Sequence, residues 1–189
     1  NDKMLSFTYE RRFEGHPAYT ELWGIRKSIR EMGNRMRKSS YSEREAARSR
    51  TNHLRERATE LEIQINEDLF SGARVIASTL VSSNHRILTG RRFTTLFIDE
   101  AAQALEAACW IAIRKADRVI FAGDHCQLPP TIKCIEAARN GLEQTLMEKV
   151  AANKQETVSL LKVQYRMHQS IMQFSSEWFY QGELQAAPE

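Results

Sequence analysis

The stretch TTLFIDEAAQ, residues 94–103, joins a short apolar run to two adjacent carboxylates, Asp99 and Glu100. A continuous apolar run of this length is typical of a strand buried on both faces of a parallel sheet. In open parallel sheets the active crevice lies at the carboxyl ends of the strands, which is where this run places its two acids. The same acids could instead simply open the following helix, because negative charge stabilises a helix N-terminus.

Around this stretch, short apolar runs alternate with helical patterns. The strand-like runs lie at residues 74–77, 95–98, 118–122 and 158–163. Residues 101–115 and 141–152 have helical periodicity and separate the last three runs, and a final helix is expected from about Gln169. A strand-helix-strand alternation predicts an α/β domain with a parallel sheet.

The residues before position 72 have a different pattern, with apolar side chains at helical spacing and charged residues between them. The apolar positions of the two segments are Leu22, Ile25, Ile29, Met32 and Met36, and then Leu54, Ala58, Leu61, Ile65 and Leu69. Each set forms one stripe along a helix, and Gly72 is placed to end the second helix. We therefore expect an antiparallel helical hairpin.

The predicted hairpin is also basic. Residues 26–57 contain eleven Lys and Arg against four Glu, a net charge of +7, whereas the whole chain of 189 residues has a net charge of +3. A basic surface of this kind binds nucleic-acid phosphates in some proteins. In others it is only the solvent-exposed face of a helix. Both explanations stay open at this point.

The composition is that of an ordinary folded domain. With 42% hydrophobic and 27% charged residues, the chain is neither disordered nor fibrous. No apolar run approaches the roughly 18 residues that a membrane span needs, and the first residues have no secretory signal pattern. We expect a soluble cytoplasmic protein, or a nuclear one in a eukaryote, with no membrane partner. Because the chain opens on Asn1 rather than Met, we also expect it to be a piece of a longer polypeptide.

The three cysteines, Cys109, Cys126 and Cys134, include no C-x-x-C pair and are expected to be reduced thiols. His125 together with Cys126 and Cys134 suggests a zinc site, but the spacing matches no common structural site and a fourth ligand is missing. We therefore predict no zinc site here.

A second apolar run ends in a polar loop, VIFAGDHCQLPP, residues 119–130. Gly123 permits a tight exit from the strand. Asp124 and Gln127 could then reach a phosphate or the water around a phosphate-bound metal, although a Gly-Asp pair is also common in ordinary turns.

A third polar segment, QYRMH at residues 164–168, follows the last apolar run. An arginine such as Arg166 can stabilise a phosphoryl group in transfer, and the ring of Tyr165 offers a surface on which adenine can stack. The ordinary alternatives are a surface ion pair for Arg166 and a core aromatic for Tyr165.

Three segments resemble, in order and spacing, motifs II, III and IV of the superfamily 1 helicases: FIDEAAQ at 97–103, GDHCQLPP at 123–130 and VQYRMH at 163–168. Within that superfamily the chain looks like the Upf-like, 5′-to-3′ branch. The resemblance implies a partial RecA-like parallel sheet of the P-loop NTPase type, with helices, preceded by the antiparallel hairpin as a stalk. It also implies ATP and Mg²⁺ as cofactors and single-stranded DNA or RNA as a partner.

The resemblance implies roles for the acids and the amide of the first two motifs. Asp99, in the Walker B segment, would hold Mg²⁺, and Glu100 would be the catalytic base. Gln127 would sense the terminal phosphate of ATP, with Asp124 beside it.

For the third motif, the resemblance implies that Tyr165 stacks on the nucleotide base and that Arg166 contacts the γ-phosphate. Upstream, VIASTL at residues 75–80 is similar to the strand and loop with which the family touches the nucleic-acid backbone. Thr79 and Ser82 are therefore candidate nucleic-acid contacts.

On this resemblance we divide the chain into three parts. Residues 1–71 form a stalk-like helical hairpin, residues 72–163 the C-terminal part of a first RecA-like motor domain, and residues 164–189 the seam to a second motor domain and its start.

One feature of the family is missing from the sequence. Each of the eight glycines is followed by a residue other than Lys, so the phosphate-binding pattern G-x-x-x-x-G-K-[ST] is absent. We expect the chain alone neither to hydrolyse ATP nor to unwind nucleic acid, and the rest of a parent helicase to supply the Walker A segment and the second motor domain.

Three functions are compatible with the sequence. The chain is a segment of an ATP-driven helicase, or a binding module in which the basic hairpin clamps nucleic acid or a protein while a degenerate motor fold supports it, or its hairpin is a purely structural stalk. The carboxylates Asp99 and Glu100 together with Arg166 favour the helicase, because a non-catalytic protein has no physical need for all three.

Overall fold

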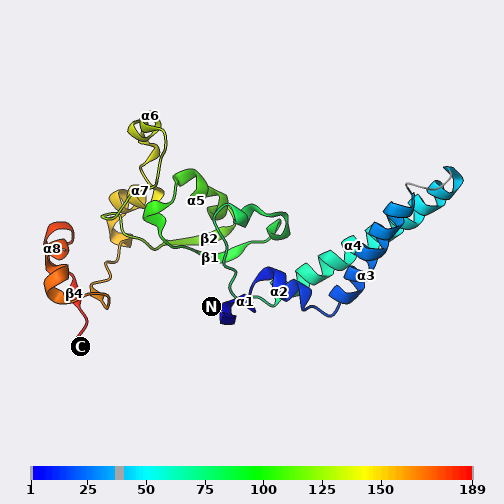
Figure 1. Ribbon diagram of the computed structural model, residues 1–189. Coiled ribbons are helices and arrows are strands. Elements are labelled where there is room, and N and C mark those ends of the chain that lie inside the picture. Colours follow the sequence, from blue (N-terminus) through cyan, green and yellow to red (C-terminus); the bar gives the residue numbers. More distant parts are fainter. Residues whose placement is uncertain (1, 37–40, 189) are drawn as a thin grey trace. The chain divides into compact units, whose positions relative to one another are not determined.

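The computed structural model describes residues 2–36 and 41–188, and the chain divides into two compact units, one up to Ala77 and one from Ser78. Figure 1 shows the first unit in blue and cyan and the second in green to red. The three-part domain division made from the sequence stays a prediction.

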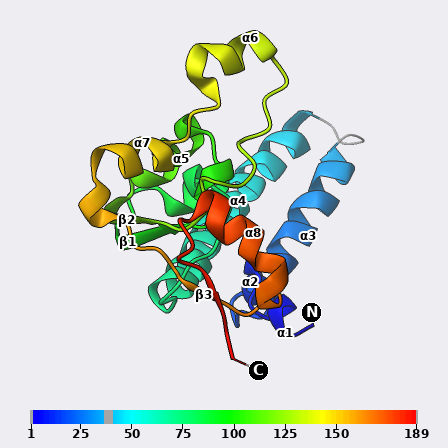
Figure 2. The same ribbon diagram turned by 90° about the vertical axis from the view of Figure 1, so that its left-hand side faces the viewer.

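The first unit is a helical hairpin. Its elements are α1 (Asp2–Leu5), α2 (Tyr9–Glu14), α3 (Tyr19–Met36) and α4 (Tyr41–Ser71). The long helices α3 and α4 lie side by side and antiparallel in both views (Figures 1 and 2), which confirms the predicted hairpin. The basic residues Arg37 and Lys38 lie outside the described residues.

The hairpin is held by the apolar stripes that the periodicity predicts. Leu22, Leu61 and Ile65 are almost completely buried, and Phe13 from α2 joins their cluster. Ion pairs flank this seam: Arg26 Nη2 lies 2.7 Å from Glu62 Oε1, and Arg57 Nε lies 3.0 Å from Glu21 Oε1. Part of the positive charge is therefore neutralised within the hairpin itself.

The second unit alternates short strands with helices. Its elements are η1 (Ser82–Asn84), η2 (Arg86–Leu88), β1 (Phe93–Ile98), η3 (Ala101–Gln103), α5 (Glu106–Ile113), β2 (Ala116–Phe121), α6 (Ile135–Ala137), η4 (Ala138–Leu142), α7 (Leu146–Asn153), η5 (Gln155–Thr157), β3 (Val163–Gln164), α8 (Gln169–Phe179) and β4 (Gln185–Ala186).

Strands β1 and β2 pair in parallel, with Phe93 opposite Ala116 and Ile98 opposite Phe121. Helix α5 connects them and packs against both strands, as the β-α-β pattern predicts. The core beneath the pair contains Ile98, Cys109 and Leu146, from β1, α5 and α7. This arrangement is the predicted α/β fold, consistent with part of a RecA-like domain.

Two of the four strands expected from the sequence differ in the structure. Residues 74–77 form no strand, and Val75 is 85% exposed. The run expected at 158–163 is a strand only at Val163–Gln164, where it pairs in parallel with β4. Backbone groups adopt a strand only beside a partner, and within the described residues the β1–β2 sheet contains just these two strands.

Two helices begin later than the periodicity indicated. The helix expected over 101–115 begins at Glu106, because Glu100 is left-handed (φ 51°) and a 3-10 turn follows it. The helix expected over 141–152 begins at Leu146, since Gly141 has φ 95° and Thr145 forms a capping box. The final helix, α8, begins at Gln169 as expected.

No helix of the described part of the chain combines the length and the apolar character needed to cross a membrane.

Candidate active site

The candidate site lies where β1 and β2 end next to each other. Beyond the last paired residues the two chains stay joined, because Ala122 N donates to Ile98 O at 2.8 Å and Ala101 N donates to Ala122 O at 2.9 Å. The turn that contains Asp99 and Glu100 is thus fixed beside the loop after β2. The parallel pairing brings two of the three predicted motifs together.

The two carboxylates after β1 are both exposed. Glu100 has φ 51° and ψ 39°, a left-handed conformation that costs a residue with a side chain on the order of 1 kcal/mol. Asp99 Oδ1 supports this turn by accepting a hydrogen bond from Glu100 N at 3.0 Å. Backbone strain is therefore located at the residue proposed from the sequence as the catalytic base.

Gly123 allows the two strand ends to approach so closely. A Cβ atom at this position would lie 2.9 Å from Ala101 N, 3.0 Å from Ala102 N and 3.1 Å from Met147 Sδ. Any side chain here would have to displace the backbone that follows Glu100.

Asp124 collects donors from its own loop and from a distant helix end. Its Oδ1 accepts from Cys126 N at 3.0 Å, and its Oδ2 accepts from Gln127 Nε2 at 2.7 Å and from the hydroxyl of Tyr180. Partial burial raises the pKa of Asp124, but these three hydrogen bonds outweigh it, so that the pKa lies below its ordinary value. Burial and the bond to Asp124 raise the pKa of Tyr180 well above its usual range.

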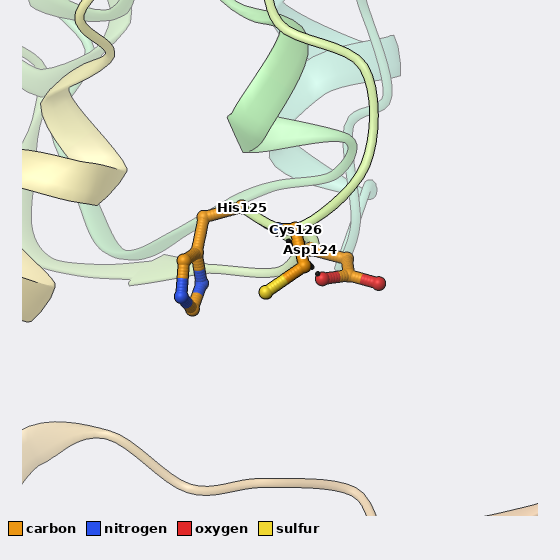
Figure 3. A group of neighbouring side chains, drawn as sticks. All are labelled: Asp124, His125 and Cys126. Carbon is orange, nitrogen blue, oxygen red and sulfur yellow. Dashed lines mark hydrogen bonds between the residues drawn. The ribbon is translucent and has the colours of Figure 1, made fainter. Parts of the chain in front are cut away.

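Asp124, His125 and Cys126 place their potential metal-ligand atoms within 4.8 Å of one another (Figure 3). Both carboxylate oxygens of Asp124 already accept hydrogen bonds, and burial together with Asp124 raises the pKa of the Cys126 thiol, which disfavours the thiolate that binds metals. Cys134 is not a member of this group of described residues. We assign no metal to the group formed by Asp124, His125 and Cys126.

The third motif forms a compact turn after β3. The side chain of Gln164 accepts from Arg166 N at 2.8 Å and from Met167 N at 2.9 Å, and it donates to Met167 O at 2.6 Å. Tyr165 is 88% exposed and Arg166 is exposed as well. Among the described residues, no hydrogen bond or ion pair joins either side chain to the ends of β1 and β2.

Thr79 and Ser82, the two candidate nucleic-acid contacts, are hydrogen-bonded to each other. Thr79 Oγ1 donates to Ser82 Oγ at 2.8 Å and accepts from Ser82 N at 3.2 Å, so Thr79 is bonded to the first residue of η1. Both residues are exposed, so their hydroxyl groups are accessible to a ligand.

The sequence did not point to Tyr180. It follows Asp124 by 56 positions and belongs to no motif, yet its hydroxyl group binds the same carboxylate oxygen as Gln127. A contact over such a separation leaves no signal in local spacing or composition.

Comparison with protein families places most of the chain in known domains. A family model described as an AAA domain matches residues 7–134, and a second AAA domain model matches residues 142–189.

Several proteins of known name are similar to this chain. The DNA-binding protein SMUBP-2 of Mesocricetus auratus is 38% identical over 170 residues, which is 87% of this chain and 17% of that protein. The DNA replication ATP-dependent helicase/nuclease DNA2 of Xenopus laevis is 40% identical over 64% of this chain and 11% of its own length. The regulator of nonsense transcripts 1 homolog of Drosophila melanogaster is 41% identical over 62% of the chain and 10% of its own length. The chain thus spans less than a fifth of the length of these relatives.

Proposed function

The chain belongs to the AAA-domain helicases of superfamily 1, in their Upf-like branch, and from this premise we propose that it forms part of an ATP-dependent motor that moves along single-stranded DNA or RNA. The observation that supports this function most strongly is the parallel pairing of β1 and β2. That pairing sets the exposed acids Asp99 and Glu100 beside the loop that contains Asp124 and Gln127.

The donor chemistry at the strand ends fits Mg²⁺, which binds through one or two carboxylates together with phosphate oxygens. Asp99 is the residue that would hold the ion, since its carboxylate is exposed and its Oδ1 is fixed by Glu100 N. When bound, Mg²⁺ neutralises negative charge on the nucleotide phosphates.

Glu100 is the residue that would orient a water molecule and accept its proton. A carboxylate in this role typically contributes a factor of about 10² to 10⁴ to the rate. Its exposed position and fixed left-handed backbone suit the role, because the carboxylate is held next to Asp99 without being paired to a cation within the described residues.

Gln127 and Arg166 would contact the terminal phosphate. Gln127 Nε2 has two hydrogens, one of which is directed to Asp124, so that Asp124 sets the orientation of the amide. The Arg166 guanidinium would stabilise the charge of the transferred phosphoryl group, an effect of about 10³ to 10⁵ in rate in enzymes that use an arginine finger. Tyr165 would stack on the adenine base through its exposed ring.

Thr79 and Ser82 would contact the backbone of the bound nucleic-acid strand.

We propose further that the helical hairpin acts as a stalk. The ion pairs Arg26–Glu62 and Arg57–Glu21 support this role, because in each pair a basic side chain of the hairpin is neutralised by an acid of the same hairpin. The remainder of the full-length protein would supply the phosphate loop and the second motor domain. We propose that the protein is cytoplasmic, or nuclear in a eukaryote, which its free cysteines support.

The proposed function is tested with the full-length protein that contains this segment. We expect single-stranded DNA or RNA oligonucleotides to stimulate its hydrolysis of ATP. The variant Glu100→Gln is expected to lose most of this stimulation. Its matched control, Glu136→Gln, at an exposed glutamate of α6, is expected to keep it. A protein that binds single strands without hydrolysing ATP would overturn the motor and favour the binding module.

A further inference from the structure

The end of helix α8 touches the loop that follows β2 at two neighbouring residues. The hydroxyl group of Tyr180 donates to Asp124 Oδ2, and Cys126 Sγ lies 3.8 Å from the carbonyl oxygen of Phe179, as a weak hydrogen bond. One contact ties the carboxylate of the loop to α8, and the other ties its thiol to the same helix end.

The first contact concerns Gln127 directly. Asp124 Oδ2 accepts from both the amide of Gln127 and the hydroxyl of Tyr180. An oxygen with two donors is fixed in position by both of them, so the orientation of the Gln127 amide depends on where Tyr180 holds the carboxylate.

Tyr180 itself is held by a hydrogen-bonded turn. Its backbone N donates to Ser176 O at 3.0 Å, and Gly182 N donates to the same oxygen at 2.9 Å. Gln181 and Gly182 are both left-handed, with φ 56° and 77°, which ends α8 and turns the chain back. Ser176 Oγ accepts from Leu184 N at 3.0 Å and secures the next residues.

From this turn, hydrogen bonds continue to the third motif. Gln185 N donates to Lys162 O at 2.8 Å, and Ala187 N donates to Gln164 O at 2.8 Å. The side chain of Gln164 in turn accepts from Arg166 N at 2.8 Å. A continuous set of bonded groups therefore runs from the Gln127 amide through Tyr180 to the backbone of Arg166.

We propose that Tyr180 is a positioning residue, which holds the Gln127 amide through Asp124 and links it to the segment that contains Arg166. The inference rests on the proposed function, since it concerns the two side chains assigned to the terminal phosphate of ATP. We assign Tyr180 no contact with the nucleotide or with the nucleic-acid strand. Its role is to hold Gln127, in the second motif, and Arg166, in the third motif, in a fixed position relative to each other.

The variant Tyr180→Phe removes one hydroxyl group and keeps the ring. With wild-type full-length protein at saturating single-stranded oligonucleotide, we expect kcat for ATP to fall about three- to tenfold with KM for ATP unchanged. Asp124 loses one of its three donors but still accepts from Gln127, so only part of the energy of the lost hydrogen bond affects the orientation of the amide. In a Gln127→Ala background, Tyr180→Phe is expected to cause no further loss. Tyr19→Phe, which removes a tyrosine hydroxyl from α3 in the hairpin, is the matched control and is expected to leave kcat unchanged.

A second measurement does not depend on catalysis. Hydrogen exchange of the full-length protein without nucleotide, read on peptides that cover residues 123–128, is expected to be faster in Tyr180→Phe than in wild type or Tyr19→Phe. Unchanged exchange, an unchanged kcat, or an equal loss of kcat with and without Gln127 would each overturn the proposal. A wild-type protein without strand-stimulated turnover would overturn the proposed function instead, and the exchange result would then decide alone whether Tyr180 orders the loop.

Discussion

A Cβ atom on Gly123 would lie 2.9 Å from the backbone nitrogen of Ala101. That nitrogen belongs to the residue after Glu100 and donates to Ala122 O at 2.9 Å. The turn with the candidate catalytic carboxylate and the loop with the candidate phosphate sensor are therefore in direct backbone contact. A change in one of them must displace the other.

We expect Gly123→Ala to lower the free energy of unfolding by about 1 to 3 kcal/mol, because the added methyl group overlaps backbone atoms that cannot rotate away. ATP turnover of the full-length protein should fall as well, since Glu100 and Gln127 lie on the two sides of the contact. Urea unfolding and steady-state hydrolysis measure the two effects.

The matched control is Gly24→Ala, in the interior of α3, where an added Cβ atom meets nothing within 4 Å. This change should increase stability by up to about 1 kcal/mol, because alanine favours the helix. If both variants were equally stable, the close contact at Gly123 would have no energetic consequence.

Thr145 caps helix α7, whose first residue, Leu146, belongs to the core. Its side chain accepts from Glu148 N at 3.2 Å, and Glu148 Oε2 accepts from Thr145 N at 2.7 Å. We expect Thr145→Ala to lower the free energy of unfolding by about 1 to 2 kcal/mol. Thr145→Ser retains the hydroxyl group and should be closer to wild type. An equal loss in both variants would assign the effect to the buried methyl group.

The low pKa of Asp124 predicts a dependence of stability on acid. Below the ordinary aspartate pKa of about 4, the unfolded chain takes up a proton that the folded protein does not, so stability falls as the pH decreases toward the folded value. Asp124→Asn should be less stable at pH 7 and should lose stability less steeply below pH 5. Urea unfolding from pH 7 to pH 3 compares the two slopes, and identical slopes would exclude this role for Asp124.

The raised pKa of Tyr180 predicts a loss of stability at alkaline pH. Because its pKa is raised in the folded protein, the unfolded chain loses the phenolic proton first, and stability falls as the pH rises above the ordinary value of about 10. Tyr180→Phe should reduce this slope. An unchanged slope would show that the hydroxyl group does not donate to Asp124 in solution.

Asp99→Asn tests the metal assignment. Loss of one carboxylate charge should raise the Mg²⁺ concentration required for half-maximal ATP turnover several-fold, because Mg²⁺ prefers charged oxygen ligands. A magnesium titration of the full-length enzyme measures the shift, and Asp117→Asn, at the exposed start of β2, serves as the control. An Asp99 variant with an unchanged titration would contradict the assignment.

The sequence was sufficient for features with local causes. The apolar runs before Asp99 and Gly123 predicted β1 and β2 and their parallel pairing, and the apolar stripes predicted the hairpin. Each depends on residue types at short spacing, which a single sequence contains.

Features that depend on distant partners were missed. Residues 74–77 have the composition of a strand, but a strand also requires a neighbour in the sheet. Tyr180 contributes to the loop of Asp124 only because α8 ends beside it. The left-handed Glu100 is set by the close approach of Ala101 and Ala122, and nothing in its residue type predicts it.

We propose that Glu100 acts in hydrolysis rather than in nucleotide binding. The most direct test measures both quantities for Glu100→Gln in the full-length protein with single-stranded oligonucleotide. We predict that the affinity for Mg²⁺-ATP stays close to wild type while strand-stimulated turnover falls by a factor of about 100 or more. Turnover that is indifferent to the substitution would contradict the claim, and so would a loss of turnover that merely follows a loss of ATP binding.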